Sequence, residues 1–122
     1  MNASSPIDPT AFANLVEMTG GDLAFVDDLV DTYLEDGSAQ VDALRDAVAR
    51  SAVEDLVRPA HSLKSSSLNV GALQLGELCR TLENAARSSS VPHPAEWVAQ
   101  IAAAFDVASR ALLDERKRRA QG

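Results

Sequence analysis

The sequence predicts an all-α protein, an antiparallel up-down four-helix bundle with a short additional helix at its N-terminus. Three observations predict this fold class. Hydrophobic residues make up 46% of the chain but aromatic residues only 4%, a composition that suits close-packed helices better than a β-sandwich or barrel. Apolar residues recur at steps of three and four along four long segments, which is the period of an amphipathic helix. The joints between these segments are short, so neighbouring helices are expected to run antiparallel.

Residues 1–7 are expected to form a flexible lead-in, and the domain is expected to span residues 8–118. Asp8 and Pro9 mark the start of a short first helix, because aspartate caps free backbone N–H groups and proline suits the first helical position. The pair of glycines at residues 20–21 ends this helix.

A long second helix is expected over residues 22–50, with Asp22 as its N-cap. Gly37 and Ser38 fall in the middle of this segment and are a candidate kink, since Gly/Ser pairs are a known cause of sharp helix bends. The apolar stripe continues on both sides of this pair, so one long helix is the expected element.

The third helix is expected to run from Ser51 to about Asn69. Ser51 and Glu54 have the spacing of a capping box, in which each side chain bonds the other residue's backbone N–H. Pro59 lies inside this segment and is expected to bend the helix, because proline has no N–H to donate and its ring clashes one turn back. Gly71 then breaks or tightly turns the chain.

Two further amphipathic helices complete the predicted bundle. The stripe of the fourth helix consists of Leu75, Leu78, Leu82 and Ala85. A loop rich in Ser and Pro at residues 88–94 separates it from the fifth helix, which begins near Pro94 and ends at about Arg118. Residues 119–122 are expected to be a frayed basic tail.

The chain is acidic, with a formal net charge of −7 and a pI near 4.6. This charge argues against nucleic acid as a partner, since phosphate binding needs clustered Lys and Arg. The basic residues near the C-terminus are interpreted as a solvated helix end, where they suit the negative pole of the helix dipole. Contact with an anionic membrane through them is the alternative.

The pattern of the remaining residues favours a cytoplasmic protein without a cofactor. Cys79 is the single cysteine and lies in an apolar repeat, so it fits a small core residue in a reducing compartment. The N-terminus lacks the apolar region of a signal peptide, and no segment has the ~18 apolar residues of a membrane span. No metal-ligand spacing and no Gly-rich phosphate loop is present, so neither a metal site nor an ATP site is expected.

Two other polar features are interpreted as solvated surface. His93 lies in a Val-Pro-His-Pro loop and is expected to be a turn residue. An acidic run on the second helix alternates with the apolar stripe and is expected to face solvent, with a contribution to partner choice as the alternative. Its members are Asp27, Asp28, Asp31, Glu35 and Asp36.

His61 flanks the apolar stripe of the third helix, with Lys64 one turn further along the same side. Two interpretations are open at this point. His61 is either a boundary histidine beside a solvated lysine or a nucleophile whose second ring nitrogen is held by a partner. In the second case Lys64 supplies a cation for an anionic adduct, and the small serines that follow let another protein approach. Glu83 flanks the stripe of the fourth helix and is the candidate group that orients the imidazole.

The pattern around His61 resembles the signature of histidine-containing phosphotransfer (HPt) domains. The matching residues are His61-Ser62-Leu63-Lys64-Ser65-Ser66-Ser67, Gly71-Ala72, Leu75, Leu78-Cys79 and Leu82-Glu83. The flanking residues 8–37 are also similar to this family, so the similarity covers nearly the whole chain. Members of the family are four-helix bundles that take a phosphoryl group from the aspartate of one receiver domain and pass it to the aspartate of another.

The resemblance implies a role for each matched residue. His61 is the phosphoacceptor, on Nε2, and Lys64 screens the charge of the phosphoryl group. Glu83 falls where the family often has Gln or Glu near the imidazole. Gly71 allows the tight joint between the two central helices. Ser65 replaces a glycine that is common in the family, a departure that is expected to leave docking intact and to alter partner preference.

The expected function is that of a phosphocarrier in a multistep two-component phosphorelay, without an ATP site of its own and therefore not an enzyme. The expected partners are receiver domains of response regulators or of a hybrid sensor histidine kinase, docking near Ser65, Leu68 and Gly71. Mg²⁺ is expected on the receiver. The alternative is a helical binding module that docks or sequesters a receiver or another partner without being phosphorylated. A monomer is expected, and Met1 without a preceding linker favours a freestanding protein.

Overall fold

The computed structural model describes residues 6–121, with side chains described for residues 6–119. The elements in chain order are α1 (Pro9–Met18), α2 (Leu23–Ala49), the 3-10 helix η1 (Val53–Leu56), α3 (Val57–Val70), α4 (Leu73–Arg87) and α5 (Pro94–Gln121). Residues 1–5 of the expected lead-in and Gly122 of the expected tail lie outside the described residues.

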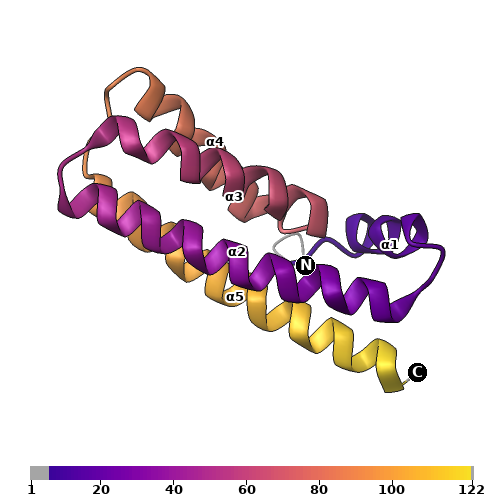
Figure 1. The fold of residues 1–122 in the computed structure, drawn as a ribbon. Helices are drawn as coiled ribbons and strands as arrows, with labels where there is room; N and C mark the ends of the chain where they lie inside the picture. The colour runs from indigo at the N-terminus through magenta and orange to yellow at the C-terminus, as the bar shows by residue number, and fades with distance from the viewer. Residues whose placement is uncertain (1–5, 122) are drawn as a thin grey trace.

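The long helices form the predicted up-down four-helix bundle, and α1 is the additional helix. In Figure 1, α2 and α5 lie side by side along one layer, and α3 and α4 form the other layer. The short α1 lies beside the end of α3, where α2 and α5 extend past the α3–α4 layer (Figure 1). Among residues 6–121, no helix is long and apolar enough to cross a membrane.

The core between the layers is almost entirely aliphatic. Its largest fully buried side chains are Phe12, Leu44, Leu56, Leu63, Leu75, Leu82, Ile101 and Leu112. The buried hydroxyls of Tyr33 and Ser67 form a hydrogen bond 2.8 Å long, which satisfies both polar groups inside this core. Burial raises the pKa of Tyr33 to about 12, so the phenol stays neutral.

The two predicted aspartate caps are confirmed. Asp8 Oδ2 accepts the backbone N–H of Ala11 at 2.9 Å, and Asp22 Oδ1 accepts that of Phe25 at 3.2 Å. Each carboxylate thereby satisfies an N–H group that has no partner within its own helix.

The structure gives Gly37 a packing role in place of a kink. The helix α2 continues through it without interruption, and Gly37 is buried against α5. A Cβ atom at this position would lie 2.3 Å from Cε1 of Phe105, closer than van der Waals contact allows. The glycine therefore makes room for the Phe105 ring, which also packs on Tyr33 with the ring centroids 5.7 Å apart.

The predicted capping box at Ser51 is wrong, and so is the placement of Pro59 inside the helix, on which the expected bend depended. Ser51 has a φ of 57° and belongs to the turn that ends α2, with its N–H donated to the Val48 carbonyl. The chain then makes the 3-10 helix η1 and enters α3 at Val57. Pro59 consequently lies in the first turn of α3, where a backbone N–H has no helical acceptor and proline removes no hydrogen bond.

Both ends of the domain differ from the sequence expectation. Ile7, assigned to the lead-in, is only 7% exposed and belongs to the core. The helix α5 continues past Arg118 to Gln121. Arg119, assigned to a frayed tail, places its guanidinium 5.2 Å from the ring centroid of Phe12 on α1.

Candidate functional site

The candidate site lies where α3 and α4 pack closely together. Gly71 ends α3 with a φ of 90°, a left-handed conformation that favours glycine, and the chain turns back into α4. Gly76 on α4 lies directly beneath Leu68 of α3, because a Cβ atom there would be 2.5 Å from Leu68 Cδ2. This close approach lets polar side chains on the two helices meet one to two turns further along the pair.

His61, Lys64 and Glu83, which the sequence singled out, are brought together by this packing. Nδ1 of His61 lies 3.0 Å from Oε2 of Glu83, and the Lys64 ammonium lies 3.1 Å from Oε1. The three side chains differ in exposure, at 52% for His61, 21% for Lys64 and 5% for Glu83. The carboxylate is therefore buried beneath an imidazole that solvent reaches.

Glu83 is ionised at neutral pH despite its burial. Burial by itself raises the pKa of this carboxyl group, but the close contacts with Arg87, Lys64 and His61 outweigh burial and lower the pKa to about 2. An ionised carboxylate only accepts hydrogen bonds, so Nδ1 of His61 must carry the hydrogen that it shares with Oε2. In the neutral ring, Nε2 is then the nitrogen with a free lone pair.

Arg87 is a member of the site that the sequence analysis missed. Its Nη2 and Nε lie 2.8 Å and 3.1 Å from Glu83 Oε2, the same oxygen that His61 contacts. The signal was present, since Glu83 and Arg87 are separated by one helical turn and opposite charges at this spacing pair on a helix surface.

The three residues expected at the docking surface fall in different places. Ser65 is exposed, and Leu68 is 38% exposed on the same helix as His61. Gly71 is buried, so the expectation that it contributes to an accessible docking surface is wrong. Its carbonyl accepts the N–H of Asp8 at 2.7 Å, which fastens the start of α1 to the α3–α4 turn.

An apolar groove begins beside Leu68 and runs between α1, α2 and α3. Its volume is about 500 Å³. The side chains that line it are Ala11, Asn14, Leu15, Met18, Leu29, Thr32, Tyr33, Asp36, Ser66, Leu68, Asn69 and Val70. Met18, at its edge, is 84% exposed, an unusual degree of exposure for a large apolar side chain.

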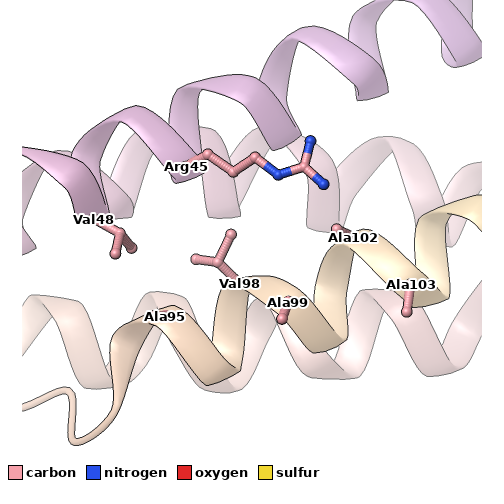
Figure 2. Close-up of a pocket in the computed structure, with 7 residues that line it drawn as sticks. All are labelled: Arg45, Val48, Ala95, Val98, Ala99, Ala102 and Ala103. Atoms are coloured by element: carbon pink, nitrogen blue, oxygen red, sulfur yellow. The ribbon is translucent and has the colours of Figure 1, made fainter.

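A second groove, of about 430 Å³, follows the seam between α2 and α5. Figure 2 shows that it is lined by small α5 side chains, such as Ala99 and Ala102, below the extended Arg45 of α2. Arg45 is its single charged lining residue, and none of the lining side chains is a nucleophile. The groove belongs to a different helix pair from the His61 cluster.

The other candidate residues from the sequence lie in a loop, in the core or in a surface ion pair. His93 is exposed in the loop before α5, and its carbonyl accepts the N–H of Glu96 at 3.0 Å. Cys79 is buried in the core, and burial raises the pKa of its thiol to about 12. Asp31, in the acidic run, pairs at 2.7 Å with Arg116 of the basic C-terminal segment. Within residues 6–119, no group of three or more His, Cys, Asp or Glu side chains is placed to hold a metal ion.

Comparison with known proteins places these observations in a family. The family model described as Hpt domain matches residues 28–111, which is more than half of the chain and includes the whole His61 cluster. The chain belongs to the Hpt domain family. Proteins of this family are phosphocarriers in phosphorelays rather than enzymes.

A solved structure agrees with this assignment. The crystal structure of histidine-containing phosphotransfer protein B (HptB) from Pseudomonas aeruginosa PAO1 is similar to the structure of this Hpt domain, with a TM-score of 0.85 and 26% sequence identity. The match covers 95% of this chain and 98% of the HptB chain. Among curated proteins, none matches the sequence.

Acidification is expected to destabilise this Hpt domain through Glu83. The pKa of Glu83 is about 2 in the folded protein and 4.5 for the unperturbed side chain, so the unfolded state takes up the proton at a higher pH. The stabilisation is therefore complete above a pH near the unfolded pKa and is lost as the pH falls through the folded pKa. Urea unfolding of the wild type and of E83Q, at neutral pH and at about pH 3, measures this loss.

The E83Q variant lacks the titrating group and keeps an amide oxygen for His61. It is expected to lose less stability on acidification than the wild type. An equal loss in both proteins would show that Glu83 is not the group held in its charged form.

Proposed function

We propose that this protein relays phosphoryl groups between receiver-domain aspartates, with His61 as the phosphoacceptor. The observation that carries the proposal is the contact of His61 Nδ1 with the buried, ionised Glu83 at 3.0 Å. It fixes the hydrogen on Nδ1 and leaves the Nε2 lone pair on a ring that is half exposed. A nucleophile in this state needs no base to activate it.

Transfer of the phosphoryl group from the receiver's aspartate to His61 requires no proton transfer. The Nε2 lone pair attacks the phosphorus of the receiver's aspartyl phosphate, the N–P bond forms, and the P–O bond breaks with its electron pair going to the departing carboxylate. The ring becomes cationic because it keeps its hydrogen on Nδ1. The Glu83 carboxylate, 3.0 Å from Nδ1, stabilises this developing charge, as the buried aspartate does for the histidine of serine proteases. In the onward step a carboxylate of the second receiver attacks phosphorus, and the N–P electron pair returns to Nε2.

Lys64 supplies positive charge for the phosphoryl group. It lies one turn from His61 on α3, and its side chain is 21% exposed, so its ammonium can be shared between the carboxylate below and an anion above. In this proposal the receiver supplies Mg²⁺, and the carrier needs no ATP site because the phosphoryl group comes from the receiver's aspartyl phosphate.

The docking surface comprises the α3 side chains next to His61 and the apolar groove that starts at Leu68. Ser65 lies one turn from His61, and Leu68 lies about one turn further towards the groove. A half-exposed leucine beside a groove of about 500 Å³ is the kind of apolar anchor that a protein partner buries. The small serines allow the backbone of a monomeric carrier to approach the receiver's active site closely.

Labelling from a phosphorylated receiver domain tests the assignment of His61. The wild type is expected to take up an acid-labile, base-stable phosphate, and H61Q is expected to take up none while keeping its helical circular dichroism. H93Q is the matched control, because His93 is the other histidine of the chain and lies exposed in a loop. Labelling retained in H61Q, or lost in H93Q, would contradict the assignment. A wild type that binds receivers and is never labelled would support a non-phosphorylated binding module.

Truncation of Leu68 tests the docking surface. L68A is expected to weaken binding of the receiver domain at least about fivefold, because fully burying a leucine side chain contributes about 1.5–3 kcal/mol and Leu68 is already partly buried. Titration calorimetry of the receiver into each variant measures the change. L113A is the matched control, since Leu113 of α5 is similarly exposed, at 42% against 38% for Leu68. Unchanged affinity in L68A, or equal losses in both variants, would exclude this surface.

A further inference from the structure

Glu83 is held by two cations in different ways. Arg87 donates twice to Oε2, at 2.8 Å and 3.1 Å, whereas Lys64 lies 3.1 Å from Oε1. Oε1 is buried and accepts no hydrogen bond of good geometry, so Lys64 neutralises it as an ion pair alone. Arg87 is therefore the firmly held partner of the carboxylate, and Lys64 is the loosely held one.

We propose that Arg87 is a positioning residue that keeps Glu83 neutralised while Lys64 moves its charge from Glu83 to the phosphoryl group on His61. This inference rests on the proposed function. A buried carboxylate that loses all its cationic partners is strongly unfavourable. With Arg87 in place, the departure of Lys64 leaves one cation on Glu83 and the hydrogen bond from His61. Without Arg87, Lys64 is the single cation on the carboxylate while the His61 ring is still neutral, so it is held there as transfer begins.

The positions of the two cations decide which of them moves. Lys64 lies on α3, one turn from His61, so it can reach an anion on Nε2 with small changes in its side-chain torsions. Arg87 lies in the last turn of α4, one turn from Glu83, and both of its contacts converge on one oxygen. The planar guanidinium suits a fixed two-pronged contact, and the flexible ammonium suits a shared one.

Two other roles for Arg87 make different predictions. A basic residue in the last turn of α4 also interacts favourably with the helix dipole, which is a purely structural effect. Because 57% of the side chain is exposed, Arg87 is also accessible to a docking receiver. Neither role depends on the charge at position 83, whereas the proposed role disappears when that charge is removed.

A double-mutant cycle between Arg87 and Glu83 tests the proposal. The rate constant of phosphoryl transfer at saturating receiver, and the receiver's Kd, are measured for the wild type, R87A, E83Q and E83Q/R87A. R87A is expected to slow transfer about tenfold in the Glu83 background, the low end of the effect of removing a partner that orients a reactive group. In the E83Q background the same change is expected to slow transfer less than about twofold, because a neutral amide needs no cation.

Two further variants accompany the double-mutant cycle, one that retains the charge at position 87 and one control elsewhere on α4. R87K retains a charge and is expected to recover part of the lost rate. R80A is the matched control, since Arg80 also lies on α4 and pairs with the exposed Glu77, and it is expected to leave transfer unchanged. Urea unfolding accompanies every variant, and R87Q provides the same comparison if R87A fails to fold.

Equal slowing by R87A in both backgrounds would overturn the proposal in favour of a helix-dipole role. A raised Kd with an unchanged rate constant would overturn it in favour of a docking contact, and an unaffected R87A would show that Lys64 is not restrained. A wild type that takes up no phosphate at His61 would instead refute the underlying function, so the two failures are distinguishable.

Discussion

The site depends on one constraint, which is that the buried carboxylate of Glu83 must stay charged. Burial opposes ionisation, and the contacts from Arg87, Lys64 and His61 reverse that effect and bring the pKa of the group to about 2. The rest of the site follows from this. An ionised carboxylate fixes the hydrogen on His61 Nδ1 and frees the lone pair on Nε2. In the proposed transfer it also stabilises the ring when the ring becomes cationic. In the proposed function, the same charge also holds Lys64 within reach of a phosphoryl group on His61.

The fold serves this constraint through the packing of α3 on α4. Gly76 allows the Leu68 side chain to press against α4, and Gly71 closes the turn between the two helices while its carbonyl fastens α1 through Asp8. The aliphatic core and the Tyr33–Ser67 hydrogen bond anchor α3 against α2. The imidazole thus stands on a closely packed pair of helices, which suits the preorganised nucleophile of the proposed function. The chain belongs to the Hpt family, and its bundle is similar to that of HptB, which agrees with this arrangement of helices.

The sequence predicts the bundle and the two aspartate caps, because these depend on helical periodicity and on local hydrogen bonding. It also predicts the meeting of His61 with Glu83, because each residue flanks the apolar stripe of one of two consecutive helices. It predicts less well where distant residues decide the outcome. The sequence suggests a kink at Gly37, whereas in the structure Phe105 on α5 occupies the space that a side chain at this position would fill. Pro59 is expected to disrupt a helix that begins at Ser51. In the structure η1 precedes α3, which begins at Val57, so Pro59 lies in its first turn. The pairing of Arg87 with Glu83 could have been predicted from the sequence, because the two residues lie one helical turn apart. Its importance for the site depends on the burial of Glu83, which only the tertiary structure shows.

The position of the hydrogen on His61 in the unphosphorylated protein decides whether Glu83 prepares Nε2 as the nucleophile. Long-range ¹H–¹⁵N NMR correlations of the ¹⁵N-labelled protein, recorded at a pH where the ring is neutral, distinguish the two ring nitrogens. Nδ1 is expected to carry the hydrogen and Nε2 to be unprotonated, because Glu83 accepts from Nδ1. A ring that carries its hydrogen mainly on Nε2 would rule out this role of Glu83, since Nε2 would then have no lone pair for phosphorus.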